Sequence, residues 1–241
     1  PLMEVWEQTF HYNHQIFEEN KLPPRATYFS LESDTLSIKE YSRRFLPLNG
    51  DWKFHFVKDP KQRPTTFQNV DFDDSSWTTI PVPANWEVEG YDHAIYLDER
   101  YPFTTQWPNV PADYNPVGTY SKGKNLIALQ LFRWSDASYL ESQDMLRMSG
   151  IEREVYLYTR PKVYIADYYA YTNLDDTYTN GIFKDTVTIS NETNEATSRI
   201  ITVELLDGDT SVYSTTETVK IPANSKVDFT SEKIIENVKK W

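Results

Sequence analysis

Residues 51–57 read DWKFHFV, and this stretch decides the fold class. The aromatic residues Trp52, Phe54 and Phe56 alternate with polar ones, so in an extended chain the rings point to one side. That two-residue period predicts a half-buried β-strand, because a helix would space its apolar residues three or four apart.

Further extended segments follow along the chain. Residues 125–132, NLIALQLF, are apolar on both faces, which is typical of an inner strand. Other strand-like segments lie at 154–158, 163–171, 186–190, 199–206, 217–221 and 226–229. The turns between the later ones are rich in Asn, Asp, Gly and Pro. Short strands at regular spacing, with almost no helical periodicity, predict an all-β protein built of antiparallel sandwiches.

A domain boundary is expected near residues 160–163. Pro161 cannot continue a central ladder, so a strand must end near it. Beyond it the composition becomes rich in threonine. The sequence therefore predicts two domains, 1–162 and 163–241.

Composition excludes several classes of function. The 241 residues carry a net charge of −12, which repels phosphate backbones and anionic lipid heads, so neither nucleic acid nor a membrane is an expected partner. There is no cysteine, and therefore no disulfide or thiolate metal site. No apolar run is long enough to span a membrane. A neutral ligand such as a sugar is compatible with this charge, and the compartment stays open between cytoplasm and periplasm.

The carboxylates do not reveal a catalytic pair by themselves. There are 36 of them, and sequence alone cannot show which ones converge in space. We interpret Glu87, Glu89 and the Asp71–Asp74 run as solvated surface charge. The rings of Trp52, Trp77 and Trp86 are interpreted as core or domain-support positions.

A series of motifs in fixed order carries a family resemblance. The motifs are NGDWKF at 49–54, PVPANW at 81–86, GYDHAIY at 90–96, YPF at 101–103, NPVGTY at 115–120 and RWSDASYLESQDMLRMSGI at 133–151. Together they resemble the N-terminal region of family 2 β-galactosidases. The last motif is long and specific. The resemblance runs from about residue 5 to the end and weakens after 163.

The resemblance implies an architecture and an activity. Residues 1–162 would form a jelly-roll-type sugar-binding β-sandwich, and 163–241 an immunoglobulin-like sandwich that is incomplete at its C-terminal end. In the family a barrel follows, with both catalytic glutamates, so no catalytic residue is expected in this chain. The parent enzyme would hydrolyse terminal β-galactosides with retention. The fragment alone would be inactive.

The resemblance also implies two site residues. Asn115 matches an asparagine that reaches the galactose pocket, and Asp136 matches an aspartate that binds a monovalent cation beside the sugar hydroxyls. An amide offers both a donor and an acceptor to a hydroxyl, and a carboxylate suits a hard cation such as sodium. Magnesium is a further expectation for the full-length enzyme only. The local alternatives are a turn cap for Asn115 and an Asx-turn for Asp136.

Charged residues surround these positions. Arg133, Glu141, Asp144 and Arg147 form a strip for which we expect an inter-domain salt-bridge network rather than ligand contact.

One departure from the family lies near residues 121–125. In the family several strands stand between the equivalents of Ser121 and Asn125, and here the two are nearly adjacent. Loss of inner strands would destabilise a sandwich. The hypothesis is that residues of a longer sequence are omitted here or that the chain joins two pieces of it, and a continuous 28.3 kDa mass would count against it.

Alternative functions stay open. They are a free-standing carbohydrate-binding module, a structural sandwich pair without a ligand, and a sister specificity such as β-glucuronidase, β-mannosidase or a fucoside preference. For the parent enzyme we expect a β-galactoside as the partner molecule and a homo-oligomeric state.

Overall fold

The computed structural model describes residues 13–16, 18–98, 100–123, 127–140 and 144–240. Contacts divide the chain into two compact units. The first holds Leu46–Leu157 with the described residues up to Lys21, and the second holds Leu22–Phe45 with those from Tyr158 onward. Residues 22–45 thus group with the second unit, although the predicted division at 162/163 assigns them to the first domain. That predicted division stays a prediction.

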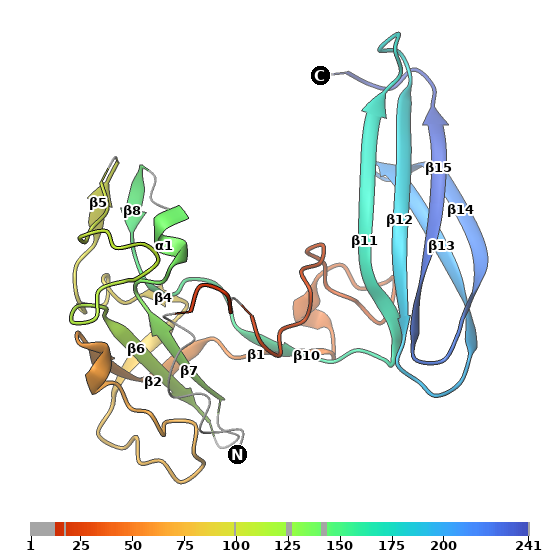
Figure 1. Cartoon of the computed structure of the whole chain (residues 1–241). Helices are drawn as coiled ribbons and strands as arrows, with labels where there is room; N and C mark the ends of the chain where they lie inside the picture. Colours follow the sequence, from red (N-terminus) through yellow and green to blue (C-terminus); the bar gives the residue numbers. More distant parts are fainter. Residues whose placement is uncertain (1–12, 17, 99, 124–126, 141–143, 241) are drawn as a thin grey trace. The chain divides into compact units, whose positions relative to one another are not determined.

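A four-stranded antiparallel sheet forms the centre of the first unit (Figure 1). Its strands, in spatial order, are β3 (Thr78–Val82), β2 (Gly50–Val57), β6 (Val117–Lys122) and β7 (Ile127–Phe132). Three small two-stranded sheets join β4 (Ala84–Asn85) to β9 (Gly150–Ile151), β5 (Ile95–Leu97) to β8 (Met145–Arg147), and β1 (Phe45–Pro47) to β10 (Tyr156–Tyr158). The short helices of this unit are η3 (Pro60–Gln62) and α1 (Ala137–Leu140), and η2 (Lys39–Tyr41) belongs to the second unit.

The core of this unit lies on one face of that sheet. Trp52 and Phe54 of β2 pack with Tyr120 of β6 and with Trp86, and each is at most 1% exposed. Burying a large apolar side chain of this kind contributes roughly 1.5–3 kcal/mol. The predicted strand at 51–57 and the predicted core positions Trp52 and Trp86 are therefore confirmed.

The opposite face of the sheet is covered by the segment between β2 and β3. Trp77 stacks on His55 with ring centroids 5.5 Å apart, so it supports the sheet while staying partly exposed. The Gln130 amide donates to the Pro64 carbonyl at 3.1 Å.

The prediction that residues 125–132 form an inner strand is wrong. Within the described sheet, β7 pairs only with β6 and lies at the end of the strand order. Both of its faces are partly covered: Leu131 packs against the aromatic core, and the Arg63 guanidinium lies over the Phe132 ring at 5.5 Å.

The second unit is a two-layer sandwich of long strands (Figure 1). One sheet has the order β11 (Val163–Leu174), β12 (Gly181–Asn191), β15 (Ser225–Ile235), and the other pairs β13 (Thr197–Asp207) with β14 (Thr210–Ile221). Val187, Ile189, Ile221 and Phe229 form the core between the layers. The predicted later strands are confirmed, although they run to 11 or 12 residues.

The all-β sandwich architecture expected from the sequence is confirmed. Strands dominate both units, and α1, the one α-helix among the described residues, spans only four residues. Within the ranges given above, no barrel is present and no helix is long and apolar enough to cross a membrane.

Candidate functional site

Asn115 is completely buried just before β6. Its Oδ1 accepts a hydrogen bond from the Trp134 N–H at 2.8 Å, and its Nδ2 donates to the Trp134 carbonyl at 2.9 Å. The Arg133 N–H also donates to the Pro116 carbonyl at 2.8 Å. These bonds fix the segment that enters β6 to the segment that leaves β7. Each end of the amide can still form one further hydrogen bond.

Asp136 lies two residues after Trp134 and directly before α1. Its main-chain carbonyl accepts from the Tyr139 N–H at 3.1 Å. Its side chain makes no hydrogen bond or ion pair with any described residue, and the residue is only partly buried. Among the described residues, no group therefore bonds to the carboxylate oxygens.

The two predicted site residues lie on two segments that hydrogen bonds join to each other. Asn115 holds Trp134, and Trp134 stands two residues from Asp136. The charge of one carboxylate is compatible with a monovalent cation, and the expected sodium stays a prediction. In the described part of the chain, no group of three or more His, Cys, Asp or Glu side chains lies close enough together to hold a metal ion.

A buried ion cluster anchors the same region. The Arg133 side chain is 1% exposed, pairs through Nη1 with the Asp92 carboxylate, and lies 3.8 Å from Glu87 Oε1. Its Nη2 donates to the carbonyls of His93 at 2.8 Å and of Arg147 at 3.2 Å. The guanidinium thus binds two segments that are distant in sequence, residues 87–93 and Arg147.

The interpretation of Glu87 as solvated surface charge is wrong. Its side chain is 2% exposed, and its Oε2 accepts from the Ser149 N–H at 2.9 Å. The role of Asp92 was not identified from the sequence. The GYDHAIY motif offered a signal, but no local pattern pairs its aspartate with an arginine 41 residues away.

Opposing effects act on the Asp92–Tyr114 pair. Burial alone would raise the pKa of Asp92, but the hydrogen bond from Tyr114 and the charge of Arg133 together hold that pKa below its usual value. Burial and the bond to Asp92 raise the pKa of the Tyr114 hydroxyl to about 12. At neutral pH the cluster therefore contains an ionised Asp92 and a protonated Tyr114.

The rest of the charged strip behaves differently from the expectation. The ionic partners of Arg133 lie in the same unit, so its ion pairs are not inter-domain ones. Asp144 accepts a hydrogen bond from the Tyr96 hydroxyl. Glu141 lies outside the described residues, as do residues 124 and 125 of the expected departure from the family.

Glu87 and Asp92 do not form a catalytic pair. Glycoside hydrolysis needs two carboxylates that flank a scissile bond with room for the sugar between them. Here both face a buried arginine and are at most 2% exposed. Their arrangement holds the backbone in place, because both carboxylates bond to groups of this unit: Asp92 to Arg133 and Tyr114, and Glu87 to the Ser149 N–H.

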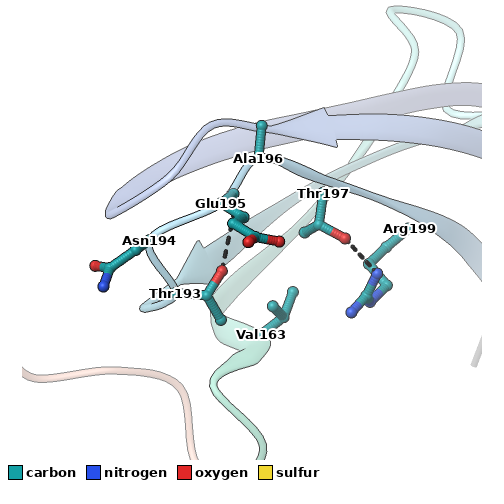
Figure 2. Close-up of a pocket in the computed structure, with 7 residues that line it drawn as sticks. All are labelled: Val163, Thr193, Asn194, Glu195, Ala196, Thr197 and Arg199. Atoms are coloured by element: carbon teal, nitrogen blue, oxygen red, sulfur yellow. Dashed lines mark hydrogen bonds between the residues drawn. The ribbon is translucent and has the colours of Figure 1, made fainter.

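The second unit contains an open recess of about 320 Å³ (Figure 2). It is lined by Val163, Thr193, Asn194, Glu195, Ala196, Thr197 and Arg199. Its polar groups bond locally: Arg199 Nη1 donates to Thr197 Oγ1 at 2.6 Å, and Thr193 Oγ1 donates to the Glu195 carbonyl at 3.0 Å. Asn194 and Arg199 lie at opposite ends of it, so they do not converge on one ligand atom.

Sequence profiles of one family match most of the chain. The profile described as "Glycosyl hydrolases family 2, sugar binding domain" matches residues 45–123 and 121–161, two segments that meet at the end of β6. The profile described as "Glycosyl hydrolases family 2" matches residues 163–241.

Curated relatives are much longer than this chain. A beta-galactosidase of Priestia megaterium is 30% identical over 229 residues, which cover 70% of this chain and 22% of the relative. A beta-galactosidase of Photobacterium profundum is 33% identical over 235 residues, which cover 75% of this chain and 22% of the relative. The chain thus spans less than a quarter of their length. The alignment with the first relative has 229 positions, but it covers only 70% of the 241 residues of this chain. The remaining positions hold residues of the relative that have no counterpart in this chain.

Solved structures share the fold. A calcium-binding mutant of Bacteroides uniformis beta-glucuronidase 2 matches with a TM-score of 0.53 and 14% identity, over 82% of this chain and 28% of that one. A beta-glucuronidase from glycoside hydrolase family 2 matches with a TM-score of 0.52 and 15% identity, over 82% and 27%. At this identity the likeness concerns the fold alone.

Proposed function

The chain belongs to glycosyl hydrolase family 2, and from that premise we propose that it is the N-terminal, non-catalytic part of a β-galactosidase. The observation that carries the proposal is the pair of hydrogen bonds between Asn115 and Trp134, which joins the segment of Asn115 to the segment of Asp136. The beta-galactosidases among its relatives favour a β-galactoside as the substrate.

Within the pocket, the two residues have different roles. The remaining donor and acceptor positions of the Asn115 amide bind a sugar hydroxyl. The Asp136 carboxylate is one ligand of a sodium ion, which when bound offers a positive charge to the sugar hydroxyls. The Asn115 amide is bonded to Trp134 at both ends, so it is held in a fixed orientation and loses little conformational entropy on binding.

The chemistry itself belongs to the rest of the protein. Retention through a covalent galactosyl intermediate requires a nucleophile and an acid/base carboxylate, and the described carboxylates of this chain supply neither. The proposed homo-oligomer and any magnesium site likewise rest on the longer protein. This chain provides architecture and one wall of the substrate pocket.

The test uses the full-length protein and a chromogenic β-galactoside. We expect Asp136→Ala to lose about 2–4 kcal/mol of transition-state stabilisation, measured as kcat/KM, and to lose the response to sodium. Asp113→Ala is the matched control, since Asp113 is exposed and close to Asn115 in sequence.

Each outcome decides a different part of the proposal. A wild type that ignores galactosides and cleaves another glycoside would refute the substrate. An active wild type with an unchanged Asp136→Ala variant would refute the site.

A further inference from the structure

Asp92 joins the two segments that carry Asn115 and Asp136. Its Oδ1 accepts a hydrogen bond from the Tyr114 hydroxyl at 2.6 Å, and Tyr114 directly precedes Asn115. Its Oδ2 pairs with Arg133, three residues before Asp136. One carboxylate thus contacts the chain on both sides of the proposed pocket.

The position of Asp92 is itself well fixed. Its backbone is in the left-handed region, with φ at 61°, a conformation that Asp and Asn tolerate better than other side chains with a Cβ. Its side chain is 1% exposed, and His93 Nδ1 lies 2.9 Å from its Oδ1. The His93 carbonyl accepts from Arg133 Nη2, which ties the turn to the guanidinium a second time.

Among the described residues, Asp92 is the one carboxylate within hydrogen-bond distance of the Arg133 guanidinium. Glu87 is the second acid near Arg133, but its Oε1 lies 3.8 Å from Nη1, beyond hydrogen-bond distance, and has no hydrogen-bond partner among the described residues. A buried guanidinium without a bonded counter-ion is costly. Removal of the Asp92 charge should therefore let the Arg133 segment move toward solvent, and Trp134 with it.

We propose that Asp92 is a positioning residue, which holds Asn115 and Asp136 in register for the sugar and the cation. The inference rests on the proposed function of that site. Residues that orient the direct ligands of a metal or substrate typically change metal affinity or activity by about 10–100-fold when they are replaced. We expect a loss of that size in kcat/KM for Asp92→Asn.

Two variants of the full-length protein separate charge from hydrogen bonding. Asp92→Asn keeps the shape and the tolerated backbone conformation but removes the charge. Tyr114→Phe removes only the 2.6 Å hydrogen bond and leaves the ion pair in place, so it decides the question if Asp92→Asn does not fold. Asp185→Asn is the matched control: Asp185 is also a buried aspartate, but it lies in the second unit.

The decisive measurement is the sodium concentration that gives half-maximal activity. If Asp92 positions Asp136, both variants need several-fold more sodium, and the control does not. If the network only stabilises the fold, both variants lose thermal stability while their sodium requirement stays at the wild-type value, and the proposal is overturned.

Hydrogen exchange keeps this inference distinct from the proposed function. A wild type without galactosidase activity would refute that function. The anchoring by Asp92 is then judged from the Trp134 amide, which is bonded to Asn115 Oδ1. Faster exchange there in both variants, well below the unfolding temperature, supports the anchoring. Unchanged exchange refutes it.

Discussion

Asn115 and Trp134 are joined by two hydrogen bonds that run in opposite directions, from the Trp134 N–H to Oδ1 and from Nδ2 to the Trp134 carbonyl. The side chain pairs with the backbone as a neighbouring strand would. It connects the ends of β6 and β7 at the point where the regular pairing of the two strands stops at Val117 and Phe132.

Asn115→Ala should lower the stability of the first unit. The change leaves the Trp134 N–H and carbonyl buried and without these partners, so we expect a loss of about 2–4 kcal/mol in the free energy of unfolding. Urea unfolding followed by tryptophan fluorescence measures it, because all the described tryptophans lie in this unit. The exposed Asn109→Ala should change it by less than about 0.5 kcal/mol. Equal losses in the two variants would contradict the prediction.

Gly118→Ala should overpack the aromatic core. A Cβ at this position would lie 2.6 Å from Cζ3 of Trp86 and 2.8 Å from Cε2 of Phe54, and both rings are fully buried. We expect a cost of about 1–3 kcal/mol in the same unfolding experiment.

A second substitution tests the cause of that cost. Phe54→Leu removes the Phe54 ring atom that the new methyl group would contact and leaves the closer contact with Trp86. The double variant Gly118→Ala with Phe54→Leu should therefore lose less than the sum of the two single losses. Strict additivity would show that the contact with Phe54 is not responsible.

Asp185→Asn should stabilise the second unit at neutral pH. Asp185 is 6% exposed on β12, and burial raises its pKa above 3.8, the ordinary value of an aspartate. The folded state thus holds the proton more tightly than the unfolded state, so this contribution to stability is present below 3.8 and is lost as the pH rises through the folded pKa.

The gain from Asp185→Asn should therefore depend on pH. At pH 7 we expect about 0.5–2 kcal/mol, the usual range for a stabilising substitution, and it should shrink toward zero as the wild-type carboxyl becomes protonated. Thermal unfolding followed by tyrosine circular dichroism measures the difference. Asp176→Asn, at an exposed position, is the control. A gain in stability that does not depend on pH would refute the explanation by the raised pKa of Asp185.

The 241-residue chain by itself should not hydrolyse a chromogenic β-galactoside. Hydrolysis needs a facing carboxylate pair, and the acids that come together in the first unit, Glu87 and Asp92, are buried against Arg133. Hydrolytic activity that co-purifies with the chain would contradict this prediction. Calorimetric titration of the chain with galactose tests the alternative that it is a free-standing binding module. That alternative predicts measurable affinity without the rest of the protein.

Local patterns predicted the strands and part of the core. The alternation in DWKFHFV is a property of neighbouring residues, and it correctly placed Trp52 and Phe54 on the buried face of β2. The threonine-rich alternation after residue 163 likewise predicted the strands of the second unit. Periodicity succeeds here because the pleat of a strand determines which side chains share a face.

Lateral order was not predictable from such patterns. The apolar residues of β7 suggested an inner strand, yet in the described sheet it lies at the end of the order. Apolar residues on a face of a strand indicate which groups pack against that face, here the aromatic core and the Arg63 side chain. They carry no information on which strands pair with it along its edges.

The sequence by itself determined the all-β class, the family motifs and the two candidate site residues, because these depend on residue type and local order. Only the tertiary structure decided that Asp92, Tyr114 and Arg133 meet, and that Glu87 is buried beside them. Their separations along the chain range from 5 residues for Glu87 and Asp92 to 46 for Glu87 and Arg133. A charge is buried only where the fold supplies a partner, so the environment of a carboxylate is a property of the packed chain and not of its neighbours in sequence.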